Sequence, residues 1–150
     1  MIVAAVAGAM SAFAFAVLIR VPRRDLLLGA LCGLVSGLVY SLAGSFGPHA
    51  ILQVLVAAVA AGALSEILAR LRRTPATVYL MPGLIPLVPG LLAYHAMYAL
   101  LQGDYVTGAA VALETIYWAA AIGVGVALVL TLARSRGGRP AGKAGGPREE

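Results

Sequence analysis

The segment from Thr74 to Gly90, TPATVYLMPGLIPLVPG, contains four prolines inside an otherwise apolar run. Proline has no backbone N–H and clashes with the carbonyl one turn earlier, so a regular helix is interrupted at Pro82, Pro86 and Pro89. In a lipid bilayer the freed main-chain groups find no water, and such backbone is tolerated only inside protein or beside a watery cavity. The segment therefore predicts a discontinuous membrane helix, the kind that holds substrate in many transporters.

The composition places this segment in a membrane. Of the 150 residues, 61% are hydrophobic and 11% are charged, whereas a soluble domain is about 25% charged. Because each span needs about 20 apolar residues, the length fits a bundle of about five. We predict an all-α integral membrane protein with one transmembrane domain, residues 1–134, whose fourth span is broken by Pro-Gly motifs. The expected spans are residues 1–19, 26–43, 50–69, 76–101 and 107–133.

The basic residues gather in three short clusters, at residues 20–24, 70–73 and 134–148. Each cluster borders an apolar run, so the net charge of +5 is read as topology and not as a nucleic-acid surface. Lys and Arg collect on the cytoplasmic face of inner (plasma) membrane proteins. The pattern predicts an N-terminus outside, a broken segment that crosses once and a cytoplasmic C-terminus. We expect the tail, residues 135–150, to be disordered and attracted to membrane lipid.

Enzyme and metal signatures are missing from the sequence. The single cysteine, Cys32, has no partner for a disulfide or a metal site, and no catalytic arrangement or cofactor-binding loop is recognisable. The sequence therefore predicts no catalytic residues, no metal and no cofactor.

Small residues recur along the second expected span. Gly29, Gly33 and Gly37 stand four residues apart and form an extended GxxxG face along which another helix backbone can approach closely. Such a face serves either packing within the chain or contact with a second subunit, including a homo-oligomer. The spacing leaves both open.

The interrupted segment is the predicted binding site for a small-molecule substrate. Unpaired N–H groups at the start of the helix after Gly90 would bind a carboxylate, and carbonyls freed by the prolines would bind an ammonium. The candidate residues are Pro82, Gly83, Pro86, Pro89, Gly90 and, one turn later, His95.

Glu114 is the other candidate, because it lies inside the fifth expected span with no basic residue within helical reach. A carboxylate there either faces a cavity or takes up a proton, so Glu114 is a candidate for proton coupling. A hydrogen-bonded structural glutamate is the alternative, just as His95 is equally explained by a bond to a freed carbonyl.

The run TPATVYLMPGLIPLVPGLLAYHAMYALLQGDY, the ALETI stretch at residues 112–116 and the stretch from Val21 to Arg24 together resemble the small-component domain of the threonine/serine exporter family. The resemblance covers residues 13–134. It implies an inner-membrane export subunit for threonine, serine or dicarboxylates such as succinate. It also implies a larger membrane partner subunit on a separate chain.

Two other functions stay open. A non-transporting assembly subunit would keep the prolines only as a packing kink. A small homo-oligomeric drug exporter has a similar size, but such proteins carry an essential acid in the first span, and residues 1–19 contain none.

Overall fold

The computed structural model describes residues 2–46 and 49–136, and within these ranges the regular structure is entirely helical. The long helices α2, α3 and α6 alternate with shorter ones. In chain order the elements are α1 (Ile2–Leu18), α2 (Leu26–Ala43), the 3₁₀ turn η1 (Gly44–Phe46), α3 (Ala50–Arg72), α4 (Thr77–Leu84), the 3₁₀ turn η2 (Ile85–Leu87), α5 (Gly90–Leu101) and α6 (Tyr105–Arg136).

The apolar helices confirm the predicted fold class, an all-helical membrane bundle with a broken helix. Among the described residues, α2, α3 and α6 are each long and apolar enough to cross a bilayer. The pair formed by Thr77–Leu87 and Gly90–Leu101 passes the same test together and is bent by 47°. The first helix, at 17 residues, is shorter than a typical span of about 20. Of the predicted tail, residues 135 and 136 belong to α6, and residues 137–150 lie outside the described part of the chain.

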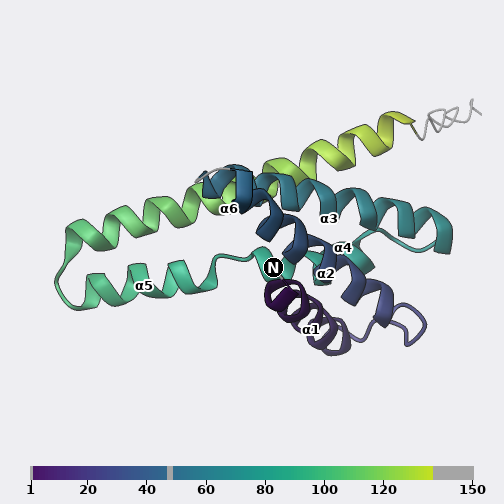
Figure 1. Cartoon of the computed structure of the whole chain (residues 1–150), viewed down its shortest axis with the longest axis horizontal. Helices are drawn as coiled ribbons and strands as arrows, with labels where there is room; N and C mark the ends of the chain where they lie inside the picture. Colours follow the sequence, from purple (N-terminus) through teal and green to yellow (C-terminus); the bar gives the residue numbers. More distant parts are fainter. Residues whose placement is uncertain (1, 47–48, 137–150) are drawn as a thin grey trace, which may run out of the picture.

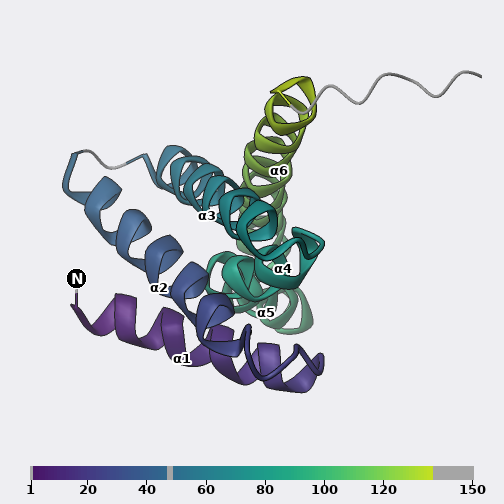
Figure 2. The same ribbon diagram turned by 90° about the vertical axis from the view of Figure 1, so that its right-hand side faces the viewer.

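The helices form a bundle from which one hairpin extends. Figures 1 and 2 show α1 beside α2, while α2 also contacts α3 and α4. The C-terminal part of α6 runs along α3, and its N-terminal part pairs with α5. The α5–α6 hairpin reaches beyond the other helices in Figure 1, so much of its apolar surface has no neighbour within the described chain.

The glycine face of α2 is used inside the chain. A side-chain carbon added at Gly8 of α1 would lie 2.6 Å from the carbonyl oxygen of Gly33, so these two backbones approach as closely as two glycines allow. At Gly29 the added carbon would lie 3.5 Å from the ring of Pro82. The same face of α2 therefore accepts α1 at one level and the proline of α4 at another.

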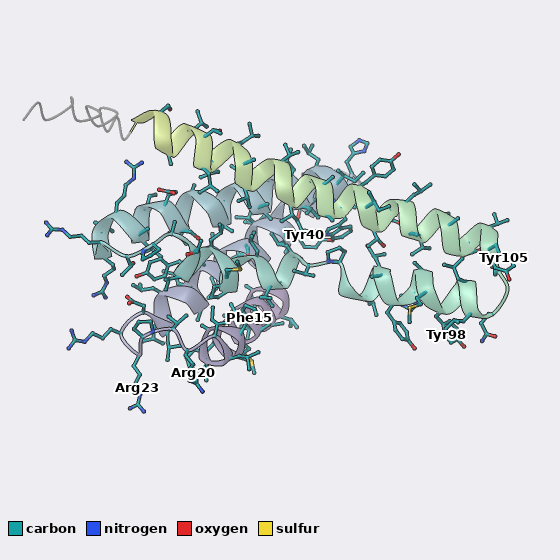
Figure 3. All side chains as sticks on the ribbon, turned by 180° about the vertical axis from the view of Figure 1, so that it is seen from behind. Phe15, Arg20, Arg23, Tyr40, Tyr98 and Tyr105 are labelled. Atoms are coloured by element: carbon teal, nitrogen blue, oxygen red, sulfur yellow. The ribbon has the colours of Figure 1, made fainter. Side chains whose placement is uncertain are left out.

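The basic clusters meet at one end of the bundle. Arg70 at the end of α3 donates a hydrogen bond of 2.8 Å from Nη2 to the carbonyl oxygen of Ala133 on α6. Figure 3 shows Arg20 and Arg23 at this same end, opposite the hairpin tip that carries Tyr105. The first two basic segments and the end of α6, where the third begins, thus lie at one end of the described chain.

Candidate functional site

The break in the helix covers fewer residues than predicted from Pro82, Pro86 and Pro89. Helix α4 continues through Pro82 to Leu84, and the regular pattern ends only at Val88 and Pro89, after the turn η2. The ring of Pro82 is accommodated because Gly29 on α2 leaves room beside it. The N–H of Gly90 donates to the carbonyl oxygen of Val88 at 2.8 Å, a tight turn that redirects the chain into α5.

Two carbonyls at the break are bonded by side chains from other helices. Ser36 of α2 donates from its hydroxyl to the carbonyl oxygen of Gly83 at 2.7 Å. Trp118 of α6 donates from Nε1 to the carbonyl oxygen of Leu87 at 2.9 Å. Both acceptors are therefore satisfied inside the protein, which is how broken backbone is stabilised in a bilayer. Ser36 and Trp118 were not among the predicted site residues, although each is a hydrogen-bond donor placed in an apolar span.

The first half of the predicted site is sealed. Pro82 and Gly83 are both buried, and a carbon added at Gly83 would lie 2.9 Å from Cβ of Cys32. No space for a ligand is left at this contact. Pro82 and Gly83 therefore serve as a close packing surface against α2.

The second half of the predicted site borders a hollow. A cavity of about 370 Å³ lies between α1, α2 and η2, and its polar side chains are Ser11 and Tyr40. Pro86 and Leu87 form its wall on the side of the break. The complete lining is Ala7, Gly8, Ser11, Gly37, Tyr40, Pro86 and Leu87. Gly37, the third glycine of the α2 series, is buried and lines this hollow.

The start of α5 is open. Pro89 precedes the helix without a side-chain hydrogen bond to its first turn. A carbon added at Gly90 would meet no atom within 4 Å among the described residues. No side chain caps this first turn; the N–H of Gly90 donates to the carbonyl oxygen of Val88, and that of Ala93 donates to the carbonyl oxygen of Pro89.

His95 and Glu114 lie away from the hollow beside Pro86. His95 is exposed on α5, with its ring centroid 5.7 Å from that of Tyr94 in an edge-on contact. Glu114 is exposed on α6, where it lines a groove of about 700 Å³ between α3 and α6 together with His49 and Tyr117. The structure does not bring His95, Glu114 and the proline segment into one site.

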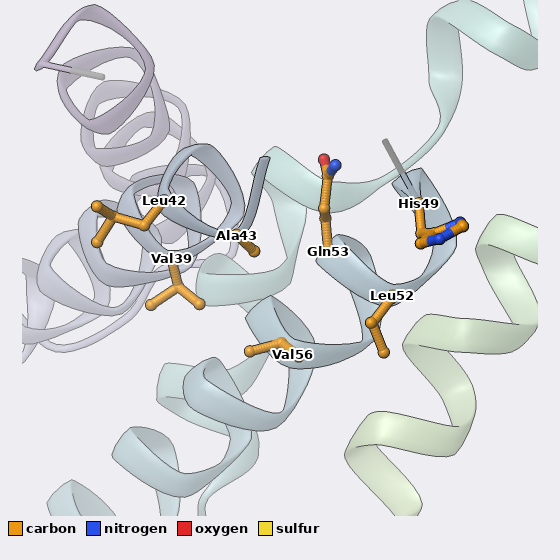
Figure 4. Close-up of a pocket in the computed structure, with 7 residues that line it drawn as sticks. All are labelled: Val39, Leu42, Ala43, His49, Leu52, Gln53 and Val56. Atoms are coloured by element: carbon orange, nitrogen blue, oxygen red, sulfur yellow. The ribbon is translucent and has the colours of Figure 1, made fainter. Parts of the chain in front are cut away.

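A third hollow, of about 360 Å³, lies where α2 ends and α3 begins. Figure 4 shows its wall of aliphatic side chains, with His49 at the α3 end on the side facing α6. His49 lines both this hollow and the α3–α6 groove. Apolar side chains predominate in this hollow, and neither Pro86 nor Pro89 lines it. It therefore offers few polar groups to bind a charged substrate.

A buried polar cluster fixes the other end of the broken helix. The hydroxyl of Tyr79 on α4 donates to Oδ1 of Asp25 at 2.9 Å, and the hydroxyl of Thr74 donates to that of Tyr79 at 3.1 Å. Nε of Arg72 lies 3.9 Å from the same carboxylate oxygen. Asp25 is only 6% exposed, so its charge is compensated by these partners. The N-terminal end of α4, which lies at the basic end of the bundle, is thereby held by hydrogen bonds and charge to the start of α2 and the end of α3.

No metal site is apparent in the part of the chain that the structure describes, where His, Cys, Asp and Glu side chains nowhere form a group of three.

The chain is similar in sequence to one family of known proteins. Searches of curated proteins and of solved structures found no match. A family model described as "Threonine/Serine exporter, ThrE" matches residues 4–132, most of the chain. This is a family of transporters and not of enzymes. The chain, with its membrane bundle and interrupted helix, belongs to the threonine/serine exporter family.

Proposed function

We propose that this chain is the small subunit of a two-component inner-membrane exporter. Its substrates would be small metabolites that carry a carboxylate, either amino acids such as threonine and serine or dicarboxylates such as succinate. The observation that carries the proposal is the hollow of about 370 Å³ beside Pro86 and Leu87, in a chain that belongs to an exporter family.

The hollow has the size and setting of a small-ligand site. Ligand pockets are typically about 300–1,000 Å³, mostly apolar with a few polar groups. Here the polar groups are the hydroxyls of Ser11 and Tyr40. The uncapped first turn of α5 begins three residues after Leu87. The N–H groups of Gly90 and Ala93 are bonded to carbonyls of Val88 and Pro89, so those of Leu91 and Leu92 would attract a carboxylate. The proposal assigns no substrate contact to His95 or Glu114, because neither lines this hollow.

The exposed apolar surface of the α5–α6 hairpin supports a role as one subunit of a larger complex. Leu91, Met97 and Leu101 of α5 are 70%, 63% and 78% exposed. Apolar surface on this scale marks either lipid contact or a protein interface. We propose that a larger membrane component of the same family, on a separate chain, covers part of it.

The topology follows from the basic end. With the clusters at residues 20–24, 70–73 and 134–136 on the cytoplasmic side, the proposed N-terminus is outside and the C-terminus inside. The bent pair from Thr77 to Leu101 then crosses the membrane once, so that α6 returns its basic end to the cytoplasm.

Filling the hollow tests the proposal. Ser11→Phe places a ring in the cavity, whereas Met10→Phe places the same ring one residue earlier, where the native side chain is 68% exposed. The chain is co-expressed with the larger component, and efflux of labelled threonine, serine and succinate is followed. We expect Ser11→Phe to stop efflux and Met10→Phe to retain it. Full efflux from Ser11→Phe at normal membrane levels rules out this site.

A non-transporting assembly subunit is the second candidate, and the sealing of Pro82 and Gly83 favours it. The two functions differ at Pro86. A cysteine at that position would react with a water-soluble maleimide if the hollow is wet, as export requires. In an assembly subunit it would stay unlabelled, like the buried Cys32.

A further inference from the structure

Glu114 is an acid on the outside of a membrane helix without a partner in the described part of its chain. It is the tenth residue of α6, about 14 Å along the helix from Tyr105. Within residues 2–46 and 49–136 no hydrogen bond or ion pair reaches its carboxylate. His49 lines the same groove but makes no such contact with it. A carboxylate on a membrane helix is costly unless a polar partner, a watery cavity or a bound proton compensates it.

A second copy of this chain does not supply the missing cation. All 11 Lys and Arg residues fall within residues 20–24, 70–73 and 134–148. In a copy with the same orientation the described members of these clusters lie at the basic end, and Arg136 is 22 residues from Glu114, about 33 Å along α6. An Arg side chain does not span that distance. Among the described residues, no Lys or Arg of a second copy in this orientation reaches Glu114, which favours a different protein as the source of the complementary charge.

The groove around Glu114 has the surface that a helix needs. Ala120 and Ala121 line its floor on α6, opposite Leu55 of α3. A carbon added at the nearby Gly123 would meet no described atom within 4 Å. Small residues let a second backbone approach closely where lipid gives no hydrophobic drive for association. The volume of about 700 Å³ leaves room for the side chains of a docked helix.

We propose that the α3–α6 groove is the docking surface for a membrane helix of the larger exporter component, and that this helix places a Lys or Arg against Glu114. The inference rests on the proposed two-component function and names the surface through which it is assembled. It gives Glu114 a role in partner recognition, distinct from proton coupling.

Photocrosslinking in the assembled complex tests the surface. Ala120→p-benzoylphenylalanine is introduced into the full chain, which is co-expressed in cells with the larger component carrying an affinity tag. Co-purification reports whether the complex exists, and the adduct reports whether the groove is occupied. Glu114→Gln is then added. The matched control is Glu66→Gln, since Glu66 already pairs with Arg70 of its own helix at 3.7 Å.

We expect an adduct between position 120 and the larger component. Glu114→Gln removes the charge that a Lys or Arg of the partner helix would pair with, so it should lower the adduct yield about tenfold, equivalent to about 1.4 kcal/mol. Glu66→Gln should leave the yield unchanged. If the complex co-purifies but position 120 reacts only with lipid or with a second copy, the docking surface is wrong and the two-component function stands. An adduct that is indifferent to Glu114→Gln also overturns the charge pairing. If no complex co-purifies, the proposed function fails, and the inference fails with it.

Discussion

Trp118 on α6 donates a hydrogen bond from its indole Nε1 to the carbonyl oxygen of Leu87 at 2.9 Å. This bond joins the longest helix to the point where the backbone is interrupted. The ring of Trp118 also lies against Tyr40, with centroids 5.9 Å apart, and Tyr40 lines the hollow beside Pro86. One side chain therefore satisfies the broken backbone and supports the wall of the candidate site.

Trp118→Phe tests this double role. Phenylalanine keeps a ring against Tyr40 but leaves the carbonyl of Leu87 without a donor, and Leu87 is only 3% exposed. An unsatisfied buried acceptor costs about 1–3 kcal/mol. We expect the free energy of unfolding in detergent, followed by circular dichroism, to fall by that amount. Tyr117→Phe is the control because Tyr117 is 58% exposed, and equal stability of the two variants would contradict the role of the indole bond.

Tyr79→Phe tests the fastening at the basic end. The substitution removes the hydroxyl that donates to Asp25 at 2.9 Å and leaves a nearly buried carboxylate with Arg72 at 3.9 Å. We expect a loss of about 1–3 kcal/mol in the free energy of unfolding, with faster proteolysis of the 73–76 connection before α4. Tyr98→Phe serves for comparison, since the Tyr98 hydroxyl accepts only an exposed bond from Gln102. If Tyr79→Phe is as stable as Tyr98→Phe, the cluster does not hold α4.

The sequence allowed the fold class and the presence of a broken helix to be predicted, because both depend on local composition. It placed the first interruption at Pro82, whereas α4 continues to Leu84. The second expected span, residues 26–43, coincides with α2. The basic end of α3 contacts both the end of α6 and Asp25 before α2, as a shared end for the basic clusters predicts. These features follow from apolar runs, prolines and charged residues, whose effects on the structure are local in the sequence.

The candidate site was only partly predictable, because it depends on contacts between distant segments. The spacing of Gly29, Gly33 and Gly37 indicated a packing face but not its partners. The structure places α4 and α1 against Gly29 and Gly33, and Gly37 in the wall of the hollow. Asp25 and Tyr79 are 54 positions apart, so no local pattern relates them. The prolines alone did not separate the sealed half of the segment from the half that borders the hollow.

Paired glycine substitutions test the α1–α2 contact. A methyl group at Gly8 would lie 2.6 Å from the backbone oxygen of Gly33, which cannot rotate away. Gly8→Ala must therefore push the helices apart, and overpacking of this kind costs about 1–3 kcal/mol. Gly123→Ala on α6 meets no described atom within 4 Å and should gain up to about 1 kcal/mol from helix propensity. Titration with a denaturing detergent measures both, and a destabilised Gly123→Ala together with a neutral Gly8→Ala would reverse the expected order.

The α5–α6 connection gives a prediction for low pH. Asp104 precedes α6 and accepts a hydrogen bond of 3.1 Å from the backbone N–H of Thr107. Hydrogen bonding from the Thr107 side chain, with a smaller contribution from its backbone N–H, holds the pKa of Asp104 below its usual value. Because the folded-state pKa is depressed, the cap stabilises α6 fully above the ordinary aspartate pKa. The contribution is lost as the pH falls through the lower folded value.

We therefore expect hydrogen exchange at the Thr107 amide, corrected for its intrinsic pH dependence, to show falling protection as the medium is acidified through the aspartate range. Asp104→Asn keeps an oxygen acceptor for the cap but does not titrate there, so its corrected protection should be flat over the same interval. A native chain with equally flat protection would mean that Asp104 does not cap α6. If the corrected protection of the Thr107 amide falls equally in both proteins, the titrating group is another acid. The stability of the first turn of α6 would then not depend on the charge of Asp104.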